Sequence, residues 1–209
     1  MKNLIVGILF FCFTASIGAT MLRNGDILFQ IGGDSAFSDA ILTATAGKAQ
    51  LEFDHAAILW QKSDSVFYVI EASPTVGVCI LSLSEFLETS PKISGKPGVV
   101  VKRIKDNIPL DEAIGRALSC VGQPYDWYFM PDNGAKYCTE LIYDSYLDEE
   151  GNHIFETKPM NFRDTDGNMP DFWVNLYKKL GVDVPEGIPG TNPNDMSNDP
   201  VLIEVYRFF

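Results

Sequence analysis

The sequence predicts an α+β fold in which an antiparallel, barrel-like sheet packs against several helices. Two segments rich in β-branched, aromatic and small apolar residues, 53–60 and 66–72, flank a polar stretch at 61–65 and predict a β-hairpin. A helical spacing of apolar residues begins at Cys138, after a connection that contains glycine and proline. Strands joined by a hairpin are antiparallel, so the hairpin and the helix at Cys138 indicate the fold class.

The first 19 residues have the layout of a secretory signal peptide. Lys2 precedes an apolar core from Leu4 to Phe13, and small residues lead to a predicted cleavage site near Ala19. The apolar core is shorter than the roughly 20 residues that span a membrane. Cys12 follows two phenylalanines rather than the small residues that precede a lipoprotein cysteine. We therefore expect an exported protein, periplasmic or extracellular, without a stable membrane anchor.

Residues 20–209 are predicted to form a single domain, because no repeat, low-complexity tract or long linker divides them. The formal net charge of the chain is −12. An acidic protein repels phosphates, so nucleic acid is not expected as a partner.

Three cysteines, Cys79, Cys120 and Cys138, lie after the predicted cleavage site. An odd number leaves at least one thiol unpaired in an exported protein. A disulfide between Cys79 and Cys120 and three reduced thiols are both compatible with the sequence. The cysteine spacing lacks a paired-cysteine zinc signature, so neither a metal nor a cofactor is predicted.

The other elements follow from apolar spacing and from residues that begin or end helices. A helix at 37–44 is predicted to be capped by Asp34 or Ser35 and ended by Gly47. Segment 184–200 holds four prolines and is predicted to be a long loop that borders the binding site. The remaining predictions are strands at 25–30, 99–104 and 201–209, and helices at 83–87 with Ser84 as a possible cap, at 110–121 and at 170–180.

Cys138 lies in the first turn of its predicted helix. Unpaired backbone N–H groups and the positive end of the helix dipole gather there, and both favour a thiolate. The thiolate is the reactive nucleophile of cysteine chemistry. A buried structural cysteine is the alternative when Cys138 is taken alone, so its partners must decide between the two.

His55 and Glu71 lie on the two strands of the predicted hairpin. If Trp60 pairs with Val66, His55 falls directly opposite Glu71 and their side chains share one face. Glu71 would then hold one ring nitrogen and leave the other facing the thiol. The alternatives are that His55 is a hydrogen-bonded histidine of the core and that Glu71 is a surface residue. Glutamate is, however, poorly suited to an apolar strand unless it has a buried partner.

The stretch 122–127, Gly-Gln-Pro-Tyr-Asp-Trp, followed by a cysteine that opens a helix, resembles the NlpC/P60 class of papain-like cysteine hydrolases. In that class the histidine follows the cysteine, whereas here His55 precedes Cys138. Histidine first and cysteine last is the order of a circularly permuted branch, the YiiX/YebB-like proteins with a permuted papain fold. Further segments resemble that branch, at 25–29, 69–72 and 185–193.

The resemblance implies hydrolysis of an amide bond, with Cys138 as nucleophile, His55 as base and Glu71 orienting the imidazole. It also implies that the Tyr125 hydroxyl is an oxyanion donor beside the backbone N–H of Cys138. A packed aromatic side chain is the alternative for Tyr125. Export and the resemblance together imply a cell-wall peptide or a small aminoacyl amide as substrate.

Two other functions stay open. The related LRAT-like proteins act on lipid acyl groups, so a lipid acyl hydrolase or transferase is the second enzyme hypothesis. A non-catalytic binding module on the same fold is the third hypothesis.

Three polar features receive no chemical role. His153 lies in a predicted loop, and Asp54 is expected on the strand face opposite His55. Segment 164–168 matches the start of a calcium loop, but Met169 stands where that loop needs glycine and Asn175 where it needs glutamate. A solvated turn is therefore predicted at 164–168.

Overall fold

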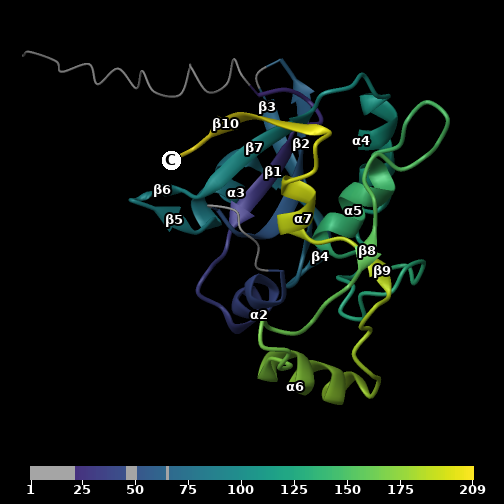
Figure 1. The fold of residues 1–209 in the computed structure, drawn as a ribbon. Helices are drawn as coiled ribbons and strands as arrows, with labels where there is room; N and C mark the ends of the chain where they lie inside the picture. Colours follow the sequence, from purple (N-terminus) through teal and green to yellow (C-terminus); the bar gives the residue numbers. More distant parts are fainter. Residues whose placement is uncertain (1–21, 46–50, 65) are drawn as a thin grey trace, which may run out of the picture.

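The computed structural model describes residues 22–45, 51–64 and 66–209 (Figure 1). The predicted signal peptide at 1–19 and the predicted helix end at Gly47 lie outside these residues. Within the described residues, six strands form one antiparallel sheet in the order β10-β7-β1-β2-β3-β4, which confirms the predicted fold class. The strands are β1 (Ile27–Ile31), β2 (Phe53–Ser63), β3 (Val66–Ser73), β4 (Gly77–Ser82), β7 (Val99–Ile104) and β10 (Leu202–Arg207).

Helices cover both faces of the sheet. On one face α4 and α5 pack against each other (Figure 1), and Ile114 and Leu141 join Ile58 of β2 in one buried cluster. On the other face Phe86 of α3 packs in a second cluster with Leu59. Burial of both faces explains the continuous apolar runs at the centre of the sheet, 56–59 of β2 and 99–101 of β7. The helices are α2 (Ala36–Thr45), α3 (Leu83–Thr89), α4 (Leu110–Ser119), α5 (Cys138–Ser145), α6 (Asp171–Leu180) and α7 (Pro193–Ser197).

The β2–β3 hairpin is longer than predicted. The segment 61–65 was expected to be a loop, but β2 continues through Ser63, with an irregularity in its pairing after Gln61. The side chain of Lys62 lies over the rings of Trp60 and Tyr68, 5.7 and 5.6 Å from their centroids. Polar residues can thus extend the strand, because a long side chain covers aromatic surface while its charge stays in water.

The register of this hairpin differs from the predicted one by two residues. Trp60 pairs with Tyr68 rather than with Val66. Successive side chains alternate between the two faces of a sheet, so a displacement of two residues returns each side chain to the same face. His55 and Glu71 therefore share a face, as diagonal neighbours instead of direct partners.

Strand β4 was not predicted. It pairs with β3 and places Cys79 directly opposite Glu71. Its sequence, Gly-Val-Cys-Ile-Leu-Ser, is short and without polar alternation, so no period-two pattern marked it.

The segment 184–200 is more regular than the predicted loop. It contains β9 (Pro189–Gly190), which pairs with β8 (Lys158–Pro159), and the short helix α7. The Asn192 side chain accepts a hydrogen bond from the N–H of Asp195, and Pro193 is the first helical residue. Asparagine before proline is a helix-start signal, and the loop prediction overlooked it.

Two helix starts are settled by their capping side chains. The hydroxyl of Ser35 accepts the N–H of Ser38 at 3.0 Å, so Ser35 caps α2. Helix α3 is capped by Ser82, which forms a capping box with Glu85, and the predicted cap at Ser84 was wrong. Another pair of short strands, β5 (Lys92–Ile93) and β6 (Lys96–Pro97), follows α3.

Candidate active site

Cys138 is the first residue of α5 and is almost fully buried, with 4 % of its surface exposed. The residue before it, Tyr137, donates its backbone N–H to the Glu140 carboxylate at 3.3 Å. That contact closes the first turn of the helix. The N-terminus of α5 thus presents a thiol among backbone N–H groups that have no partner within the helix.

His55 joins the hairpin to this helix. Its Nε2 lies 2.6 Å from Oε2 of Glu71, and both side chains are 13 % exposed. The imidazole also interacts with the side chain of Cys138. Because Nε2 is engaged by Glu71, Nδ1 is the ring nitrogen available to the thiol. The structure therefore brings together Cys138, His55 and Glu71.

His55 and Glu71 each stabilise the charged form of the other. Burial by itself lowers the pKa of His55, but interactions with Cys138 and Glu71 outweigh burial and hold that pKa well above its ordinary value. Burial likewise raises the pKa of Glu71, yet the hydrogen bond and charge of His55 bring it below its ordinary value. The pair therefore favours an imidazolium beside a carboxylate.

Glu71 has a second partner that sequence reasoning missed. The sulfur of Cys79, on β4, lies 3.9 Å from Oε1 of Glu71. Burial and the Glu71 carboxylate raise the pKa of Cys79 to about 11, so this thiol keeps its proton. Cys79 and Cys120 are both free thiols, which answers the open question of their pairing. Because β4 was not predicted, no pattern in the sequence indicated the contact between Cys79 and Glu71.

A β-bulge adjoins the histidine. The pairing of β1 with β2 runs from Gln30 with His55 to Ile31 with Phe53, so Asp54 has no partner in the ladder. Asp54 accepts the N–H of Gly33 at 3.1 Å, while its Oδ1 is buried without a hydrogen-bond partner among the described residues. The simple alternation expected for Asp54 and His55 is therefore interrupted by the bulge.

Tyr125 is 8 % exposed and lies within an aromatic cluster. Its ring centroid is 4.9 Å from that of Trp127 and 6.2 Å from that of Phe37 on α2. Burial, with a smaller electrostatic effect of the neighbouring Cys138 side chain, raises the pKa of Tyr125 well above its ordinary value, so its hydroxyl stays protonated. Tyr125 is thus a packed aromatic residue that also retains a hydrogen-bond donor.

A cavity of about 40 Å³ lies beside Cys138 and is lined by Tyr125 as well. One of its walls is the segment 191–193, inside the region expected to border the binding site. Thr191 anchors that wall to the start of α5. Its N–H donates to the Tyr137 hydroxyl at 3.0 Å, and its own hydroxyl donates to Thr139 at 2.9 Å.

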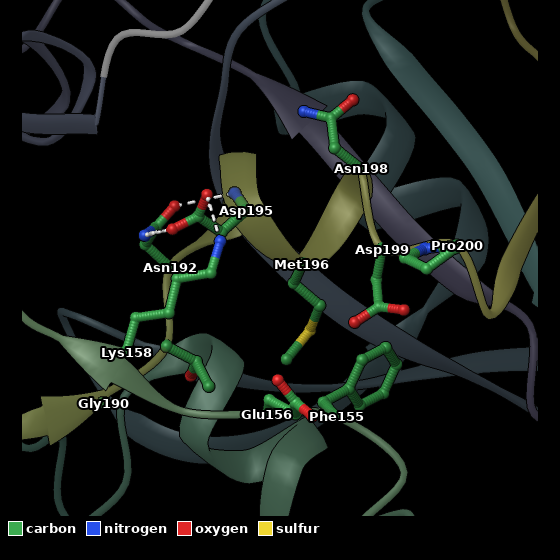
Figure 2. Close-up of a pocket in the computed structure, with 11 residues that line it drawn as sticks. Phe155, Glu156, Lys158, Gly190, Asn192, Asp195, Met196, Asn198, Asp199 and Pro200 are labelled. Carbon is green, nitrogen blue, oxygen red and sulfur yellow. Dashed lines mark hydrogen bonds and ion pairs between the residues drawn. The ribbon is translucent and has the colours of Figure 1, made fainter.

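A larger hollow of about 230 Å³ lies on another side of this segment and contains none of the predicted site residues (Figure 2). In Figure 2 the amine of Lys158 points toward Asp195, and the two are 3.0 Å apart. Asn192 donates to the same carboxylate at 2.9 Å. These polar contacts connect α7 to β8.

The features without an assigned role also have structural explanations. The His153 ring stacks on Tyr143, with centroids 3.9 Å apart, and its Nδ1 lies 2.9 Å from the Tyr143 carbonyl. The Asp164 carboxylate accepts hydrogen bonds from the N–H groups of Asp166 and Asn168, and these bonds close a turn.

A thiol at the start of a helix, beside an imidazole that a carboxylate holds, is the arrangement found in cysteine hydrolases. Residues 21–206 match the family model described as "Permuted papain-like amidase enzyme, YaeF/YiiX, C92 family". The chain belongs to this C92 family of permuted papain-like amidases.

Two relatives are similar over most of their length. The chain is 26 % identical over 189 residues to "Uncharacterized protein YiiX" of Escherichia coli (strain K12), covering 88 % of this chain and 86 % of that protein. Its fold matches a crystal structure of "metalloprotein yiiX" from Escherichia coli O157:H7 with a TM-score of 0.70 and 24 % identity, covering 90 % of this chain and 98 % of that one. At this identity the second match shows a shared fold.

The YiiX protein of that crystal structure is described as a metalloprotein. Across the described ranges of the present chain, no three His, Cys, Asp or Glu side chains gather into a group that could hold a metal ion. The His, Cys, Asp and Glu side chains of the described residues therefore do not fit a metal site. Nor does any described helix have the length and apolar character needed to cross a membrane.

Proposed function

We propose that Cys138, His55 and Glu71 are the catalytic triad of an amidase that cleaves cell-wall peptides or small aminoacyl amides. The observation that carries this proposal is the position of the His55 imidazole, which hydrogen-bonds Glu71 through Nε2 at 2.6 Å and also contacts the Cys138 side chain. A base held by a carboxylate and in contact with a thiol is the arrangement needed for nucleophilic catalysis.

The reaction proceeds in two balanced steps. The Cys138 sulfur attacks the amide carbonyl carbon, the C–N bond breaks, and the thiol proton passes through His55 to the departing amine. A thioester and a free amine result. Water then attacks the thioester with His55 as base, which releases a carboxylic acid and restores the thiol. Glu71 stabilises the imidazolium in both steps.

Negative charge on the carbonyl oxygen needs donors during each attack. The backbone N–H of Cys138 at the start of α5 is one donor, and the protonated hydroxyl of Tyr125 is the second. Both residues line the same small cavity.

The substrate and the location of the protein are part of the proposal. The signal-peptide layout of residues 1–19 supports export, and an exported amidase meets cell-wall peptides and small amides. The cavity beside Cys138, about 40 Å³, is far smaller than the roughly 300–1,000 Å³ of typical ligand pockets. That size disfavours the lipid acyl alternative, because a long acyl chain needs a long apolar channel.

The test compares wild type with Cys138→Ala and His55→Ala on cell-wall peptides, small aminoacyl amides and long-chain acyl lipids. We expect the wild type to release amine from the first two classes and both variants to lose turnover, while Cys138→Ala still binds substrate. Turnover of acyl lipids alone would favour the lipid enzyme. Binding without turnover by any of the proteins would favour a binding module.

A further inference from the structure

Two cavities adjoin the predicted catalytic residues, and they differ in chemistry. The cavity beside Cys138 is lined mainly by apolar side chains, and the hydroxyl or amide groups among its lining residues contribute little of its surface. The second cavity, of about 250 Å³, adjoins His55 and Glu71 and has a mostly polar lining. Ile41 of α2 lines both cavities, so both adjoin the same helix.

The order of bond making and proton transfer assigns the acyl half of the substrate to one cavity and the amine half to the other. The acyl group becomes bonded to the Cys138 sulfur, so it must lie on the side of the thiol. The departing amine takes its proton from His55, so it must lie on the side of the imidazole. Cys138 lines only the apolar cavity, and His55 lines only the polar one.

We infer that the apolar cavity is an acyl subsite that selects an acyl group with a small, uncharged side chain, joined to a polar amine. This inference rests on the proposed amidase function and adds its substrate class.

The walls of the acyl subsite explain the expected selectivity. Its lining includes Ala44 of α2, Met160, Phe162 and Trp173. The last two rings pack edge to face, with centroids 5.0 Å apart, and both residues are 2 % exposed. Such packed rings do not yield readily to a longer chain. A charged side chain on the acyl group would lose its hydration on entering this cavity without gaining a partner.

The polar cavity fits a hydrophilic leaving group. Ser35, Ser38 and Asp54 line it together with His55 and Glu71. Asp54 thereby adds a carboxylate to the lining of this cavity, which suits a leaving group with hydrogen-bond donors.

The experiment varies the acyl group while keeping one leaving amine. N-acetyl-, N-isobutyryl-, N-decanoyl- and N-succinyl-glycinamide release the same free amine, glycinamide, which a fluorogenic amine reagent detects. We expect kcat/KM for the acetyl and isobutyryl compounds to exceed that for the decanoyl and succinyl compounds by about tenfold or more.

Two variants should change this preference in opposite directions. Ala44→Leu fills the cavity and should reduce kcat/KM for the isobutyryl compound more than for the acetyl compound. Met160→Ala enlarges the cavity and should raise kcat/KM for the decanoyl compound relative to acetyl by about tenfold. Val174→Ala, at an exposed position of α6, is the matched control and should leave the preference unchanged. Opposite shifts cannot arise from a general loss of folding, and a melting curve for each variant checks folding directly.

The outcomes separate this inference from the proposed function. No turnover of any acyl amide or cell-wall peptide would overturn the amidase itself. Turnover with equal or greater kcat/KM for the decanoyl or succinyl compound would overturn the acyl subsite alone. An unchanged preference in both cavity variants would also overturn it.

Discussion

Cys79 lies directly across the β3–β4 ladder from Glu71, and its sulfur is 3.9 Å from the carboxylate oxygen that His55 does not engage. The carboxylate is therefore held from both sides, by the imidazole through one oxygen and by the thiol through the other. Because burial and the Glu71 charge keep the Cys79 thiol protonated, it acts as a donor. We therefore expect Cys79 to act as a positioning residue for the proposed triad.

Cys79→Ala should lower kcat/KM about fivefold, the effect of losing a hydrogen bond worth roughly 1 kcal/mol. Cys79→Ser, which keeps a donor, should retain most of the activity. The Cys79 contact lowers the pKa of Glu71, so its loss should also move the acid limb of the pH–rate profile to higher pH. An equal loss of rate in both variants without a pH shift would contradict the positioning role.

Alkylation should distinguish the three thiols. Burial raises the pKa of Cys79 to about 11 and also raises the pKa of Cys120, so both stay protonated at neutral pH. Cys138 interacts with the His55 imidazole, begins helix α5 and lines a cavity. Brief labelling with iodoacetamide at mildly acidic pH should therefore modify Cys138 first, as read by mass mapping. Equal labelling of all three in the folded protein would count against an activated nucleophile.

Tyr125→Phe should lower kcat by about 10²-fold with a smaller change in KM, because an oxyanion donor acts mainly in the transition state. Steady-state kinetics on the preferred acyl glycinamide measures both constants. Tyr128→Phe, at an exposed tyrosine of the same connection, is the control. If Tyr125→Phe retains full kcat, the residue contributes only packing.

The stability of the protein should fall as pH rises through the pKa of His55. In the folded state that pKa is held well above its ordinary value of about 6.5, by Cys138 and Glu71. The stabilisation is therefore fully present below pH ~6.5 and is lost as the folded-state pKa is passed. Melting temperatures measured from pH 6 upward should show this decline, and it should be weaker in Glu71→Gln. A decline of the same size in Glu71→Gln would exclude the ion pair as its cause.

Asn194 of α7 connects three elements near the site. Its Oδ1 accepts the N–H of Phe53 at 2.7 Å, and its Nδ2 donates to Thr45 Oγ1 at 2.8 Å. Asn194→Ala would leave a buried backbone donor unpaired beside the bulge, so it should reduce the free energy of unfolding by about 1–3 kcal/mol. Urea denaturation measures this, with Asn175→Ala on the exposed face of α6 as control. Equal stability of the two variants would show that Phe53 finds another partner.

Local pattern in the sequence determined much of the fold and of the candidate site. Alternation along two apolar segments placed His55 and Glu71 on one face, and this result survived a register error because the pattern repeats every two residues. Apolar spacing after a polar turn placed Cys138 at the start of a helix. Each inference depended on residues close together in the chain.

Only the tertiary structure decided which distant residues complete the site. Cys79 reaches Glu71 because an unpredicted strand joins the sheet, and Thr191 reaches the start of α5 from 54 positions beyond Tyr137. The apolar cavity likewise combines α2 with side chains from beyond residue 159. Such contacts form because folding buries apolar surface wherever side chains fit best. That choice depends on shape and volume in three dimensions, which no periodicity along the chain records.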